Sequence, residues 1–143
     1  LHQDTDVSNT QVGIDFRYDG FIGFWNESVM IKSDNIEIDM ITVGADYTLP
    51  IASGVLIMTE SMFIFSKQNT TTSDQTFTAF MASLPVGMFH NVMLISRLYW
   101  DVHHTYNYLR WSTTFDSFSI NYMVSINPQA VDNSLQLMFI YNH

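Results

Sequence analysis

The sequence predicts an all-β fold in which antiparallel strands run up and down, as in a transmembrane β-barrel. Three observations predict it. Strand-like segments follow one another almost without interruption, the charges within strands share one face, and tight turns alternate with more polar connections. Nine strands fit into the 143 residues. We expect residues 1–143 to form a single β-barrel domain or the C-terminal part of a larger barrel.

The composition is unusual for a soluble domain of this length. Charged residues make up only 13% of the chain, while aromatic residues reach 15%. The net charge of −9 disfavours nucleic acid as a partner, and the absence of cysteine excludes disulfides and thiolate metal sites. No apolar run approaches the roughly 20 residues of a membrane-spanning helix. The chain begins LHQDTDVSNT, without a signal-peptide pattern, so we expect a signal peptide to have been removed or not included.

The nine predicted strands share a period of two and an enrichment in β-branched and aromatic residues. In chain order they cover residues 10–18, 21–31, 36–49, 54–66, 75–84, 90–101, 105–115, 118–127 and 134–143. About 70% of the chain would then be strand, which is far above the share in ordinary globular domains and expected for a membrane barrel.

Each of the first four segments places an acidic residue opposite a more apolar face. Asp15 and Arg17 lie opposite an apolar face in the first segment, whereas the face opposite Glu27 in the second is half polar. In the third, Asp46 lies opposite an apolar face, although Glu37 and Asp39 stand on that face near its loop end. Glu60 in the fourth segment again opposes a largely apolar face. Since a charge facing lipid at mid-depth is costly, the charged face is expected to line a lumen.

The later segments repeat the pattern with cations. Arg97 in the sixth segment and Arg110 in the seventh each lie opposite an apolar face, and the eighth, FSINYMVSIN, alternates without a slip. The predicted lumen charges are therefore Asp15, Arg17, Glu27, Asp46, Glu60, Arg97 and Arg110. They either select solutes or form internal salt bridges, and the sequence leaves both open. The same face collects seven apolar side chains, Leu56, Met58, Met62, Met81, Met93, Met123 and Met138.

The connections between segments fall into two alternating kinds. Tight turns are expected at Asp19-Gly20, 50–53, 85–89 and Asp116-Ser117, and longer or more polar loops at 32–35, 67–74, 102–104 and 128–133. Outer-membrane barrels have short turns at one end and longer loops at the other, so the alternation favours a membrane barrel over a soluble sandwich.

Two stretches, NYLRWSTTFDSFSINYMVSINP followed by SLQLMFIYNH, resemble the C-terminal hairpin and closing strand of bacterial outer-membrane β-barrel proteins. VGADYTLPIASGVLIMTESMFIF resembles a porin-type strand–turn–strand unit. The resemblance implies a bacterial outer-membrane location with a periplasmic C-terminus, contact with outer-membrane lipid, and recognition of the last strand by the barrel-assembly machinery. The chain ends in His143 where that class has an aromatic residue. The sequence leaves open whether the chain forms a homo-oligomer.

Six aromatic residues near strand ends are predicted to form interfacial girdles, namely Tyr18, Trp25, Tyr47, Trp100, Trp111 and Tyr141. The adjacent His103 and His104 lack a third ligand at a recognisable spacing, so neither a metal nor another cofactor is expected. No catalytic constellation is present, and we do not expect an enzyme. The sequence predicts a passive pore or channel for small solutes of unknown identity. The alternative is a soluble lipocalin-like β-barrel or β-sandwich that binds an apolar ligand.

Overall fold

A computed structural model describes residues 9–141 and contains nine strands in one antiparallel sheet. The strands are β1 (Asn9–Asp19), β2 (Gly23–Ser33), β3 (Ile36–Leu49), β4 (Val55–Gln68), β5 (Thr71–Val86), β6 (His90–Tyr99), β7 (His104–Thr114), β8 (Phe118–Ile126) and β9 (Ser134–Tyr141). A single turn of 3₁₀-helix, Ala130–Asp132, lies between β8 and β9. The prediction of nine up-and-down strands is confirmed. The predicted continuation of the last strand to His143 lies outside the described residues.

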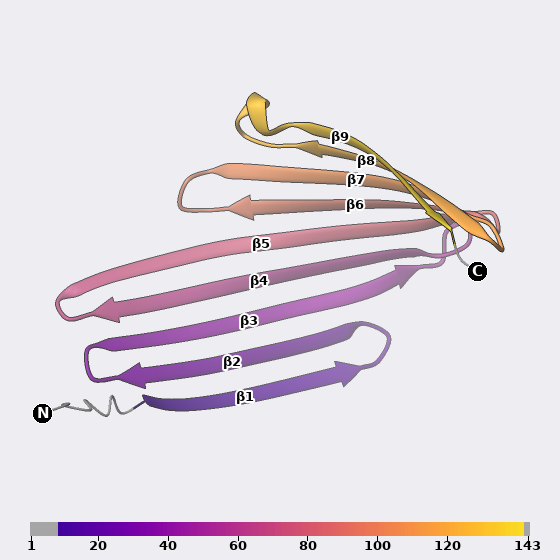
Figure 1. The fold of residues 1–143 in the computed structure, drawn as a ribbon. Coiled ribbons are helices and arrows are strands. Elements are labelled where there is room, and N and C mark those ends of the chain that lie inside the picture. Colours follow the sequence, from indigo (N-terminus) through magenta and orange to yellow (C-terminus); the bar gives the residue numbers. More distant parts are fainter. Residues whose placement is uncertain (1–8, 142–143) are drawn as a thin grey trace, which may run out of the picture.

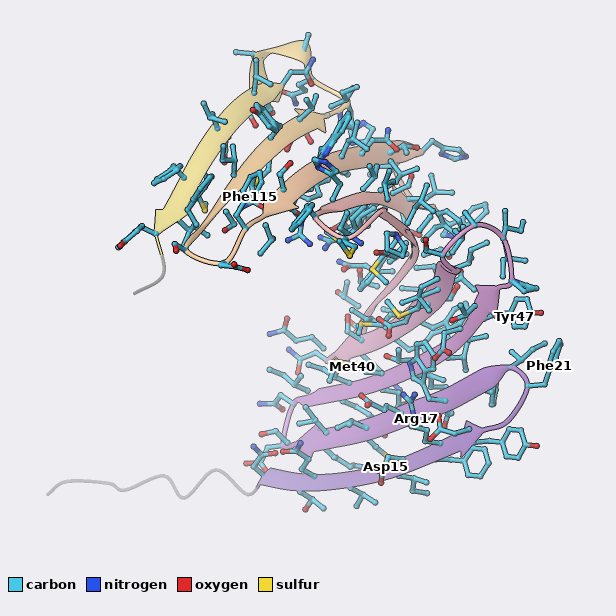
Figure 2. The ribbon with its side chains drawn as sticks, turned by 90° about the vertical axis from the view of Figure 1, so that its right-hand side faces the viewer. Asp15, Arg17, Phe21, Met40, Tyr47 and Phe115 are labelled. Carbon is cyan, nitrogen blue, oxygen red and sulfur yellow. The ribbon has the colours of Figure 1, made fainter. Side chains whose placement is uncertain are left out.

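Each strand pairs with its neighbours in the sequence, so the sheet follows the order β1 to β9 without a crossover (Figure 1). The sheet curls into a C shape, with β1 to β3 facing β7 to β9 across a hollow (Figure 2). It does not close, because β1 and β9 form its two edges and do not pair with each other. The structure therefore shows an open, curved sheet, and the predicted barrel is not confirmed.

The sheet has no second layer of secondary structure on either face within residues 9–141. Met123, with 9% of its surface exposed, is the only hydrophobic residue of this range that counts as buried. Soluble domains of this size normally enclose a contiguous apolar core. Along the same range, no helix has the length and apolarity to cross a membrane.

The two faces of the sheet follow directly from the pairing register. Residues paired across an antiparallel ladder share a face, so the ladder carries one parity assignment from β1 to β9. Met40 lies on the side of the hollow, whereas Tyr47 points away from it (Figure 2). We call the face that includes Met40 the concave face and the face that includes Tyr47 the convex face. The most buried side chains, Thr42 and Met123, belong to the concave face.

The connection expected as an eight-residue loop at 67–74 is instead a two-residue turn. β4 runs to Gln68 and β5 begins at Thr71, so most of this polar segment is paired as strand. The loop-side connections are therefore not uniformly longer than those at the other end, and the length difference inferred from the sequence is wrong. Threonine has high β propensity despite its polarity, which accounts for the longer strands.

The two-residue turn between β4 and β5 depends on Asn69, which has a positive φ of 54°. Asparagine tolerates this left-handed region better than other non-glycine residues. We expect Asn69→Ala to lower the free energy of unfolding by about 1 kcal/mol and Asn69→Gly to leave it nearly unchanged. Denaturant unfolding followed by circular dichroism measures both. Thr70→Ala is the matched control, and equal losses for Asn69→Ala and Thr70→Ala would contradict the turn.

Candidate functional site

All seven predicted lumen charges lie on the concave face. Asp15 pairs with Glu27, Arg17 with Trp25, and Glu60 with Gly44, which links the acidic strands into one surface. On the other half of the sheet, the pairing register places Arg97 of β6 and Arg110 of β7 on this same face. The seven apolar side chains predicted for the lumen, from Leu56 to Met138, share this face with the charges.

Charge is unevenly distributed over the concave face. Strands β1 to β4 carry five acids and one cation there, whereas β5 to β9 carry two arginines and no acidic residue. The curvature of the sheet brings these two halves to opposite walls of the hollow (Figure 2). We call them the acidic wall and the basic wall.

Arg17 organises the outer part of the acidic wall. Its Nε donates a hydrogen bond to Asp19 at 2.9 Å, and its Nη2 lies 3.8 Å from the carboxylate of Asp46. The guanidinium also lies 5.6 Å from the ring centroid of Trp25. Exposed ion pairs of this kind contribute little to stability, so their main effect is to hold Arg17 along the wall. Arg17 and Asp46, two of the seven predicted lumen charges, are thus close enough to form an internal ion pair.

Trp25 occupies the centre of the acidic wall. Its indole Nε1 donates a hydrogen bond to Glu60 at 3.2 Å, across the intervening strand β3. The ring lies directly over Gly44, where any Cβ atom would come within 2.1 Å of the indole. Trp25 is thus on the concave face, and the structure separates it from the other five predicted girdle residues. The alternation of side chains along the strand puts Trp25 on the same face as Glu27, so the sequence itself indicates this placement.

The basic wall lacks such internal pairing. Arg97 Nη1 reaches the hydroxyl of Tyr99 only at 3.5 Å. Arg110 Nη2 contacts the sulfur of Met93 at 3.7 Å, while its Nε is buried and has no hydrogen-bond partner among the described residues. Neither arginine forms an ion pair within residues 9–141. Both guanidinium groups therefore keep donors free for a solute or for water.

The convex face presents a wide apolar surface. Along β1 alone, Ile14 is 70% exposed and Phe16 is 56% exposed, and Leu94 and Leu109 form an exposed cross-strand pair near the middle of the sheet. Monomeric soluble proteins rarely expose apolar patches of this extent. A face of this kind needs a cover of lipid or protein.

Polar side chains in the middle of the convex face hydrogen-bond to one another or to the backbone. Ser61 and Thr78 pair at 2.9 Å, and Ser96 donates to Asn107 at 2.9 Å. Asn26 donates to the carbonyl of Thr42 at 3.0 Å. In lipid an unsatisfied polar group is costly, so this internal pairing suits a hydrocarbon environment.

The remaining predicted girdle residues lie at the two margins of the convex face. Tyr18, Tyr47, Trp111 and Tyr141 are near the end where β1 turns into β2. Trp100 lies at the opposite end, where its indole donates to Thr78 at 3.0 Å. This end also carries Asp39, on the convex face two residues further from the turn end than Ile41. Ile41 and Thr76 lie in the same cross-strand row of the sheet. The carbonyl of Thr76 accepts a hydrogen bond from the backbone N–H of Trp100, so Trp100 lies level with this row.

Asp39 is thereby placed at the margin that Trp100 marks, away from the middle of the apolar band. Glu37, one further step outward on the same face, forms an ion pair with Lys32 at 3.8 Å. An aromatic residue and a group of charges at one margin are typical of a membrane–water interface.

The histidines within residues 9–141 do not gather with acidic residues into a metal centre. His103 lies in the turn after β6, and His104 begins β7. Among the described residues, no group of three or more histidine, aspartate or glutamate side chains could hold a metal ion. The terminal His2 and His143 lie outside the described part of the chain.

Three tyrosines of the concave face were not identified from the sequence. Tyr99, Tyr106 and Tyr108 surround Arg97, and the rings of Tyr99 and Tyr106 meet edge to face with centroids 5.4 Å apart. In the sequence, the alternation of side chains along each strand puts these tyrosines on the same face as Arg97 and Arg110, and this alternation indicates them.

No protein-family model matches the chain, and neither the curated proteins nor the solved structures include a significant match.

The stack of Trp25 on Gly44 generates a test of the acidic wall. We expect Gly44→Ala to displace the indole, break its hydrogen bond to Glu60 and lower the free energy of unfolding by about 1–3 kcal/mol. Gly13→Ala on β1 is the matched control, because its Cβ would have only ordinary contacts, the nearest at 3.6 Å. Unfolding and tryptophan fluorescence report both effects. Equal behaviour of the two variants would contradict the stacking.

Proposed function

We propose that the chain forms part of the wall of a transmembrane β-barrel in a bacterial outer membrane and that its concave face lines a passive pore for small solutes. One observation carries the proposal: the strand charges gather on the concave face, while the convex face is apolar and its central polar groups are paired. Outer-membrane lipid then covers the convex face. Insertion depends on the barrel-assembly machinery.

The open edges add a requirement. Since strands alternate in direction and there are nine, β1 and β9 run the same way (Figure 1). Joining them directly, or joining β9 to β1 of a second copy in the same orientation, would create a parallel pair. Antiparallel closure needs an odd number of further strands, from a longer polypeptide or from another chain. Such strands would satisfy edge backbone groups that lipid cannot.

The first test is extraction of the full protein from its own membrane, followed by planar-bilayer recording. We expect the protein to require detergent and to give discrete conductance steps. Glu27→Gln removes an exposed acid from the acidic wall and is expected to shift the reversal potential in a salt gradient toward that of the anion. A monodisperse protein in buffer without detergent would support the soluble, apolar-ligand alternative. A membrane protein without conductance would leave a plugged or structural barrel.

Substitutions at two neighbouring residues in β6 distinguish a membrane protein with a lipid-facing convex surface from a soluble protein. Leu94 is on the convex face and Ile95 on the concave face. With lipid on the convex side, Leu94→Arg is expected to lower the free energy of unfolding by about 2–4 kcal/mol and Ile95→Arg by clearly less. Unfolding in lipid vesicles measures both. The reverse order, with the exposed Leu94 tolerant and Ile95 sensitive, would contradict a lipid-facing convex surface.

A further inference from the structure

The basic wall contains a hollow that the general pore proposal does not explain. It has a volume of about 380 Å³ and is lined by Arg97, Tyr99, Tyr106, Tyr108, Ser125 and Asn127, among others. This volume falls within the range of small-molecule sites. The hollow is formed by three adjacent strands, β6, β7 and β8, toward the loop end of the sheet.

The register explains why these side chains converge. Arg97 is directly opposite Tyr106, and Tyr108 is opposite Ile95 on one side and Ser125 on the other. Residues opposite one another on a single face have Cβ atoms about 5 Å apart, so the arginine lies in a continuous strip with tyrosine rings and small polar groups. Phe77 extends the aromatic wall, with its ring centroid 5.6 Å from that of Tyr99.

Charge in this strip is uncompensated. Strands β5 to β9 carry no acid on the concave face, and the carboxylate of Asp101, in the next turn, accepts a hydrogen bond from the backbone of Thr76. Arg97 is exposed, and Arg110 lies two concave-face rows closer to the turn end, its buried Nε lacking a partner among the described residues. A guanidinium group offers several donors in a planar fork that matches a carboxylate.

We propose that this hollow binds small aromatic carboxylates, with Arg97 holding the carboxylate and the rings of Tyr99, Tyr106 and Tyr108 packing against the aromatic part. Ser125 supplies a polar contact at the rim, where the side-chain amide of Asn127 already donates to the carbonyl of Asp132. The site rests on the proposed function in one respect, since a solute reaches it through the lumen. It assigns that lumen a preference for anions with a planar ring.

Calorimetric titration of the purified full protein with benzoate tests the site, with the uncharged benzamide as the comparison ligand. We expect benzoate to bind about tenfold more tightly than benzamide. Arg97→Gln should abolish that preference, and Arg97→Lys should retain part of it, because lysine keeps the charge and loses the fork. Tyr106→Leu should weaken both ligands by removing ring contacts. Arg17→Gln, on the acidic wall, is the matched control and should leave both unchanged.

Two results would overturn the site: equal binding of benzoate and benzamide by the unaltered protein, or undiminished preference in a folded Arg97→Gln variant. Circular dichroism establishes folding, and Arg97→Lys decides the matter where Arg97→Gln does not fold. The outcome is separable from pore function. Benzoate binding without conductance would overturn the pore and keep the site, whereas conductance without a benzoate preference would overturn the site and keep the pore.

Discussion

A single sheet without a second layer is the constraint on which every other feature of this structure depends. In a two-layer domain the apolar face of a sheet is buried against other elements of the same chain. Here each strand exposes one face to the hollow and the other to the outside, and Met123 alone among the described hydrophobic residues is buried. At about 25 cal/mol for each Å² of apolar surface, the exposed convex side chains represent a large unrealised stabilisation. Their cover must come from outside the described chain, and the lipid cover proposed above also accounts for the paired serine, threonine and asparagine side chains among them.

The backbone adds a second constraint of the same kind. Within the sheet every strand from β2 to β8 has a ladder on both sides, but β1 and β9 each have one. An exposed strand edge invites pairing with other chains, and in lipid its unpaired groups are not tolerated. In the proposed barrel, the curved sheet of Figure 2 therefore needs further strands to pair with its two open edges. Because β1 and β9 run in the same direction, the completing unit must differ from a simple second copy if all pairs are to remain antiparallel.

Much of this arrangement is local and was predictable from the sequence. A period of two fixes which residues share a face, so Asp15, Arg110 and the charges between them could be grouped before the strands were placed. The segment 67–74 misled because serine and threonine look like loop residues, although β4 and β5 use them as paired strand. Trp25 was assigned by its closeness to a strand end, while its parity with Glu27 indicated the concave face. Neither the curl of the sheet nor the facing of its two walls is local. Both depend on how nine strands accumulate twist, which no single segment encodes.

The curl of the sheet determines how its unevenly distributed charges act on a solute. In a flat sheet the acidic and basic halves would lie side by side, and each would act on solutes only near its own strands. Curling brings the acidic wall, built around the Trp25–Glu60 pair, to face the basic wall with Arg97 and Arg110. Between facing walls of opposite sign a solute experiences a field across the hollow, screened in water of physiological salt over about 8 Å. The acids of one wall are partly engaged by Arg17 and Trp25, whereas the arginines of the other retain unused donors. An anionic group entering the hollow is thus repelled by one wall and attracted by the other, and the tyrosines beside Arg97 are where its remaining surface can be buried.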